Sequence, residues 1–147
     1  MCLITDQVEP IIAANDITVY KVLQTKGLWA MVHTFKYKLR TLFQTEIKTS
    51  REYVTGDSHA HYEIVKKYPD YCGINGPVGL ISYGEGFHSY ESFHRTLKCI
   101  DNISSCYFTK FYGIYECIIP AGSEYYTSVG GTEFVSNQII IKKKISP

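Results

Sequence analysis

This 147-residue chain lacks an excess of charge of either sign, since its 15 Lys and Arg residues are matched by 14 Asp and Glu residues. Such a balance gives no general positive field, so we expect no long nucleic acid among its partners. Long hydrophobic runs are missing too, and no stretch approaches the ~20 apolar residues of a membrane-spanning helix. The opening MCLITDQVEP has no basic start, so we predict no signal peptide, no membrane partner and a cytoplasmic protein.

Paired cysteines and arginines are also scarce. The five Cys residues are odd in number and form no CxxC pair, which predicts reduced, mostly buried thiols. Only three Arg residues occur, so any bidentate clamp on a phosphate group must draw on Arg40, Arg51 and Arg95.

What the chain has in abundance is tyrosine, with 13 residues. Tyrosine suits pleated, half-buried surfaces, and it suits interfaces because one end is apolar and the other polar. We therefore expect a β-rich protein with a large contact surface. Exposed Tyr-rich strand edges tend to become buried against another molecule, so we also expect a homo-oligomer.

The length fits one domain spanning 1–147. Alternating apolar residues and turn signals predict a mainly antiparallel sheet, hence an α+β protein with one dependable helix. A polar, irregular stretch at 50–77 is predicted to be a long loop or insertion. The predicted strands are residues 17–23, 35–40, 42–49, 78–84 and 105–120, with a bulge at Gly113, and the hairpin arms 123–128 and 132–144 around Gly130-Gly131.

The helix is predicted over about 89–100, with Ser89 as its N-cap. Its apolar stripe is formed by Tyr90, Phe93, Leu97 and Ile100, at spacings of three and four.

The stretch GEGFHS, residues 84–89, is then a turn that leads into the helix N-terminus. Free backbone N–H groups and a partial positive charge at a helix N-terminus suit phosphate. In that reading Gly86 allows close approach of the backbone to a ligand, His88 and Ser89 donate hydrogen bonds, and Phe87 stacks on a base. The alternative is a structural corner in which Gly serves backbone freedom alone.

A basic face is predicted on the strand at 35–40, formed by Lys36, Lys38 and Arg40. Together with Tyr37 and nearby Trp29, this face has the residue types that stack on a base and hold phosphates. The alternative is an ordinary solvated sheet face.

Patterns for catalysis and metal binding are weak. Asp57, His59 and His61 have metal-ligand side chains, but no second cluster lies at usable spacing. The His94-Arg95-Thr96 form used by two-histidine phosphoesterases has no second copy, and Cys2 has no sequence-local base. We expect no catalytic centre, no cofactor and no metal.

Four segments carry a resemblance to known proteins: MCLITDQVEPIIAANDITVYKVL, GFHSY, YECIIPAGSEYY and EFVSNQIIIKK. Together they resemble a group of small uncharacterised proteins of gut bacteria and their phages, over about half the chain. The resemblance implies a phage or prophage setting, and hence the cytoplasm of a host cell. One class of small phage proteins sequesters the cyclic nucleotide signals of bacterial immunity.

The order of segments is also similar to the layout of ADP-ribosyltransferases. Those enzymes use an Arg or His on the first strand and a Glu at the start of the last. Here the corresponding places hold Tyr20-Lys21 and Asn137-Gln138, and Glu133 would substitute only in a different strand register. A degenerate nucleotide-binding relative fits this pattern better than an active transferase.

The sequence thus predicts a non-catalytic binding protein that sequesters a small phosphorylated ligand, a nucleotide immune signal. Two alternatives remain open, namely a module that inhibits a host protein and an ADP-ribosyltransferase-like enzyme, degenerate or active. The predicted ligand-binding residues are Trp29, Tyr37, Arg40, Arg51, Gly86, Phe87, His88, Ser89 and Arg95.

Overall fold

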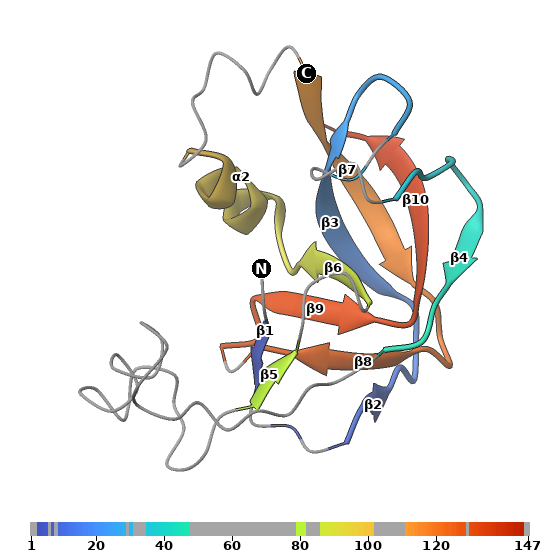
Figure 1. Ribbon diagram of the computed structural model, residues 1–147, viewed down its shortest axis with the longest axis vertical. Coiled ribbons are helices and arrows are strands. Elements are labelled where there is room, and N and C mark those ends of the chain that lie inside the picture. The colour runs from blue at the N-terminus through green and yellow to red at the C-terminus, as the bar shows by residue number, and fades with distance from the viewer. Residues whose placement is uncertain are drawn as a thin grey trace.

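The computed structural model describes residues 3–5, 7, 9–28, 30, 35–47, 79–81, 86–101, 111–128 and 130–145. Within these ranges the protein is mainly antiparallel β-sheet with a short helix, which confirms the predicted fold class (Figure 1). The strands are β1 (Leu3–Thr5), β2 (Ile11–Ile12), β3 (Ile17–Gln24), β4 (Leu42–Gln44), β5 (Gly79–Ile81), β6 (Phe87–Tyr90), β7 (Tyr112–Ile119), β8 (Glu124–Thr127), β9 (Glu133–Ser136) and β10 (Gln138–Lys144), and the helix α2 is Phe93–Asp101. The predicted loop at 50–77 lies outside the described residues.

Eight strands form one sheet in the order β2-β8-β9-β6-β3-β7-β10-β4, and β1 pairs with β5 in a separate two-stranded sheet. The centre of the large sheet is the β3–β7 ladder, whose register runs from Ile17↔Ile119 to Gln24↔Tyr112. Both strands are rich in β-branched and aromatic residues, which favour this pleated, two-sided environment. The two strands at the centre of the sheet, β3 and β7, are therefore formed by segments with strong β-strand patterns.

The large sheet turns a corner between β6 and β3. Their pairing is limited to Tyr20↔Tyr90, and in Figure 1 β8 and β9 run across the direction of β3 and β7. Such a bend lets one face of the sheet wrap around a core. The buried residues of that inner face are Val19, Leu23, Ala30, Tyr37, Phe87, Tyr115, Cys117, Ile119, Ile139 and Ile141.

Helix α2 covers the opposite face, where Phe93 and Leu97 pack against Val22 and Ile114. Its N-cap is Ser92, whose Oγ accepts a hydrogen bond from the N–H of Arg95 at 3.1 Å. The prediction that Ser89 caps this helix is therefore wrong by three residues.

Ser89 lies instead in β6, which pairs with β9 from Phe87↔Ser136 to Tyr90↔Glu133. The predicted turn is therefore a strand over its last three residues, and no phosphate site at a helix N-terminus is formed by Gly86 to Ser89. The ladder with β9 prevails because it uses backbone groups that a local turn would leave unpaired.

The predicted strand at 35–40 is also wrong, although its face assignment is partly right. Lys36, Lys38 and Arg40 are exposed and Tyr37 is buried, but Phe35 is exposed by 37% rather than buried. Backbone hydrogen bonds join this segment to residues 28 and 30 and then to Ile141, and the strand β4 begins only at residue 42. Arg40 has a φ of 55°, a left-handed conformation that interrupts the strand alternation. We call residues 35–40 the covering segment.

The predicted hairpin arm at 132–144 is two strands. Asn137 separates β9 from β10, and its side-chain Oδ1 accepts a hydrogen bond from the N–H of Glu124 at 2.9 Å. Its backbone carbonyl accepts another from Thr45 at 2.8 Å. Because the chain bends at Asn137, β9 pairs with β8 and β6 whereas β10 pairs with β7 and β4.

The predicted bulge at Gly113 is not formed. The β3–β7 register continues through Leu23↔Gly113 without a shift, and the irregularity lies in β10 between Ile141 and Lys143. A Cβ on Gly113 would lie 2.7 Å from Cε of Lys144, whose flexible, exposed side chain can move aside.

Candidate functional site

A lysine side chain lies within the apolar core. Lys21 alternates with the buried Val19 and Leu23 along β3, and its own exposure is only 9%. Its Nζ donates a hydrogen bond to the backbone carbonyl of His88 and lies 5.6 Å from the centre of the Tyr37 ring. Lysine is almost never buried this deeply without an anionic partner, so this position calls for a physical reason.

No carboxylate neutralises Lys21 within the described part of the chain, where the ion pair is Lys142–Glu116 at 3.7 Å. Burial lowers the pKa of Lys21 from 10.5 to about 8, so the ammonium form still predominates at pH 7. The neighbouring Cys117 provides no negative charge, because burial raises the pKa of its thiol to about 12. The core thus contains a positive charge that the described residues leave without a counter-ion.

A buried hydroxyl without a hydrogen-bond partner lies on the same face as Lys21. Ser89 is only 2% exposed, and its Oγ has no hydrogen-bond partner among the described residues. The antiparallel register at Tyr20↔Tyr90, continued by one residue, places Ser89 opposite Lys21 at the corner of the sheet. A buried hydroxyl and a buried ammonium therefore share the inner face where the β3–β6 ladder stops.

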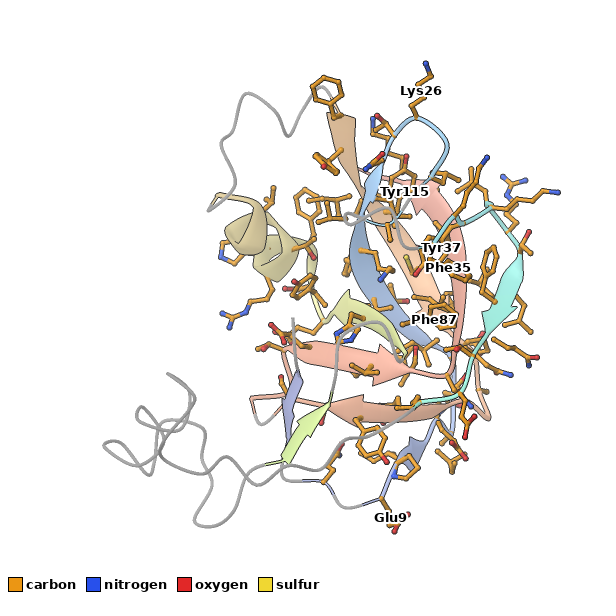
Figure 2. The ribbon with its side chains drawn as sticks, viewed as in Figure 1. Glu9, Lys26, Phe35, Tyr37, Phe87 and Tyr115 are labelled. Atoms are coloured by element: carbon orange, nitrogen blue, oxygen red, sulfur yellow. The ribbon has the colours of Figure 1, made fainter. Side chains whose placement is uncertain are left out.

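Four aromatic rings lie over this corner. Figure 2 shows Phe35, Tyr37 and Phe87 close together beside the inner face of β3. The ring centre of Phe35 lies 4.8 Å from that of Tyr37, 5.4 Å from that of Phe43 and 5.7 Å from that of Phe87. Because Phe35 is 37% exposed, this aromatic cluster extends from the core to the surface.

The rim of the cluster is cationic. Lys36, Lys38 and Arg40 are exposed and belong to the covering segment that carries Phe35 and Tyr37. The site thus combines an apolar interior, two buried polar groups and exposed cations at its rim. Apolar residues with a few polar groups are typical of small-molecule sites.

The predicted site residues are brought together only in part. Tyr37, Phe87 and Ser89 share the inner face, and Arg40 lies in the covering segment. His88 points to the other face of β6, as its alternation with Phe87 and Ser89 requires. Arg95 is exposed on α2, while Trp29 and Arg51 lie outside the described residues.

Gly86 has a packing role. A Cβ on this residue would overlap the side chain of Val135, so glycine permits the close approach of β9.

Glu133, the possible substitute for the glutamate of ADP-ribosyltransferases, is separated from Lys21. Glu133 pairs with Tyr90 on the outer face of β6 and β9, whereas Lys21 faces inward. Burial raises the pKa of Glu133, and the positive charge of Arg95 lowers it in part. Glu133 and Lys21 therefore belong to different faces of the sheet.

Comparison with protein-family models, with curated proteins and with solved structures finds no match to this chain. Within the described ranges, no helix is long and apolar enough to cross a membrane. The same ranges contain no group of three or more His, Cys, Asp and Glu residues arranged to hold a metal ion. Asp57, His59 and His61 lie outside them.

Sequence reasoning missed Lys21 as a site residue, although a signal was present. In ITVYKVL the residues Val19, Lys21 and Leu23 share one face, so the lysine occupies a place reserved for an apolar side chain. Whether a counter-ion lies near Lys21 depends on the residues that other strands place beside it. The sequence of β3 does not specify those residues.

The depressed pKa of Lys21 predicts an unusual pH dependence of stability. Between pH 8 and 10.5 the unfolded chain keeps a proton that folded Lys21 has released, so the contribution of Lys21 to the free energy of unfolding rises with pH. The slope is about 1.4 kcal/mol per pH unit. Urea unfolding at pH 7 to 11 measures it.

The thiol of Cys117 acts in the opposite direction, because its pKa rises from 9.0 to about 12 on folding. We therefore expect stability to rise from pH 8 to 9, to level off, and to fall above about pH 10.5, where only the Cys117 effect is left. A Lys21→Met variant isolates the lysine, since the wild-type stability relative to this variant should improve steadily between pH 8 and 10.5. A constant difference between the two proteins would show that Lys21 is not titrating in the core.

Proposed function

We propose that this protein is a non-catalytic binding protein that sequesters a small phosphorylated ligand of the nucleotide type. The observation that carries the proposal is the buried ammonium of Lys21, which has no carboxylate partner among the described residues. A phosphate group would neutralise this charge and accept its hydrogen bonds.

The surroundings of Lys21 supply the other contacts that such a ligand requires. The hydroxyl of Ser89 is positioned to donate a hydrogen bond to a phosphate oxygen. Phe35, at the exposed end of the aromatic cluster, offers a ring on which a base stacks. The exposed cations of the covering segment attract the ligand and raise its local concentration.

The phage-like resemblance supports a specific class of ligand. Segments that resemble proteins of gut bacteria and their phages include ITVYKV, which contains Lys21, and GFHSY, which contains Ser89. In that setting, the ligand we propose is a nucleotide signal of bacterial immunity, and sequestering it in the host cytoplasm would silence the defence. Binding without turnover agrees with the separation of Lys21 from Glu133.

The experiment that tests this proposal identifies the ligand directly. Purified protein is heat-denatured, and the released small molecules are analysed by mass spectrometry. In parallel, cyclic di- and trinucleotides and cyclic ADP-ribose isomers are screened by thermal shift. We expect a nucleotide that is recovered intact and that stabilises the protein, as binding to the native state alone must.

A matched control compares each stabilising nucleotide with its dephosphorylated nucleoside, which should give no shift. Recovery of an altered nucleotide would indicate an enzyme instead. If neither assay detects a ligand, the small-molecule proposal fails and inhibition of a host protein becomes the leading function.

A further inference from the structure

The large sheet has two open edges, β2 and β4, at the ends of the strand order (Figure 1). The N–H of Ala13 donates a hydrogen bond to the carbonyl of Ser123, the residue before β8. By antiparallel alternation, the N–H and C=O of Ile12 therefore point away from the sheet. On β4, the N–H of Thr45 donates a hydrogen bond to the carbonyl of Asn137. By the same alternation, the N–H and C=O of Gln44 point away from β10. No described strand pairs with either outer side.

Both edges expose apolar side chains. Ile12 on β2 is 57% exposed, and Leu42 on β4 is 48% exposed. Their neighbours Ile11 and Leu39 are exposed by 39% and 42%. Unpaired backbone groups next to exposed apolar side chains make each edge competent to accept another strand.

The two edges carry opposite charge. The segments that form the β2 edge, residues 7–18 and 120–128, contain Glu9, Asp16 and Glu124 and no Lys or Arg. The segments that form the β4 edge are residues 35–47 and 138–145, and their one acidic residue is Glu46. Their cations are Lys36, Lys38, Arg40, Lys142, Lys143 and Lys144. In a chain with a net charge of +1, this segregation makes each edge the electrostatic complement of the other.

We propose that β2 of one copy of this protein pairs with β4 of a second copy, so that the sheet continues from one molecule to the next. Pairing of like edges is disfavoured, because it would bring acidic residues against acidic residues or cations against cations. The paired strands are short, so few backbone hydrogen bonds form at the junction. The association is therefore dependent on protein concentration and weakened by salt.

The test uses one variant that blocks each edge. Ile12→Pro removes the outward N–H of β2, and Gln44→Pro removes that of β4, while the inward ladder bonds are retained. Sedimentation velocity over a concentration series is expected to show association of the wild type. For each variant alone, it should show association weaker by about tenfold or more, measured as a higher dissociation constant.

The decisive sample is the equimolar mixture of the two variants. Each partner retains the edge that the other lacks, so the mixture should form a complex with one copy of each, while neither variant associates alone. Circular dichroism verifies that both variants are folded.

If a proline prevents folding, Ile12→Lys and Gln44→Glu replace the prolines. Each should repel the wild-type edge, and the two together should associate. A wild type that stays monomeric, a single variant that associates like the wild type, or a mixture that behaves as the sum of its parts would each overturn the proposal. The assay contains no nucleotide, so its outcome is independent of the proposed ligand.

Discussion

Replacing Lys21 with Met is expected to make the ligand-free protein more stable and to weaken binding of the proposed ligand. The lowered pKa of Lys21 corresponds to a cost of about 3 kcal/mol for keeping its charge in the core. Methionine has a similar volume and no charge, and such replacements of buried charges are often stabilising. The lost hydrogen bond to His88 offsets about 1 kcal/mol, which leaves an expected gain of about 2 kcal/mol.

Binding should change in the opposite direction, because the phosphate loses its buried cationic partner. Truncation of one partner of a buried charge pair costs about 2 kcal/mol or more, which weakens affinity at least about 30-fold. Urea unfolding measures the stability, and calorimetric titration with the nucleotide from the ligand screen measures the affinity.

Lys143→Met is the matched control, since it removes the same charge from an exposed position of β10. Its stability should remain within about 0.5 kcal/mol of the wild type. A Lys21→Met protein that is less stable and binds normally would show that the buried ammonium serves the fold alone.

The second large effect concerns the aromatic cluster, whose inner and outer rings should differ. Phe87 is 4% exposed and packs in the core, so Phe87→Ala should destabilise the protein by about 3–5 kcal/mol. Phe35 is 37% exposed, so Phe35→Ala removes less buried area and should cost about 1–2 kcal/mol.

For ligand binding, Phe35→Ala is the informative variant, because it leaves the core folded. Loss of a stacking ring costs about 1–3 kcal/mol per base, so the affinity should fall by about tenfold or more. Phe35→Leu keeps an apolar side chain without a ring and should bind as weakly as Phe35→Ala. Full affinity in both variants would place the base elsewhere in the protein.

Local signals were sufficient to predict the class of the fold. Alternation in ITVYKVL and YECII correctly predicted β3 and β7, and Gly130-Gly131 correctly predicted the β8–β9 hairpin. These signals succeed because a pleated strand and a tight turn impose their requirements on neighbouring residues.

Errors arose where a distant partner decided the local structure. GFHSY has the composition of a turn before a helix, yet β9 pairs with it and makes it a strand, and the helix is capped by Ser92. Residues 132–144 look like one strand, but Asn137 bends the chain because Glu124 and Thr45 bond to it from other elements.

The sequence by itself determined that the protein is a β-rich α+β chain of balanced charge, with one basic cluster at residues 36–40, a second at 142–144, and a lysine within its first long strand. Only the tertiary structure decided that Lys21 has no carboxylate among its described neighbours, that Ser89 lies on its face, and that the acidic and basic segments form opposite edges of one sheet. The reason is physical: alternation along a strand fixes which face a side chain occupies, whereas the energy of a charge depends on the residues that other strands bring to that face.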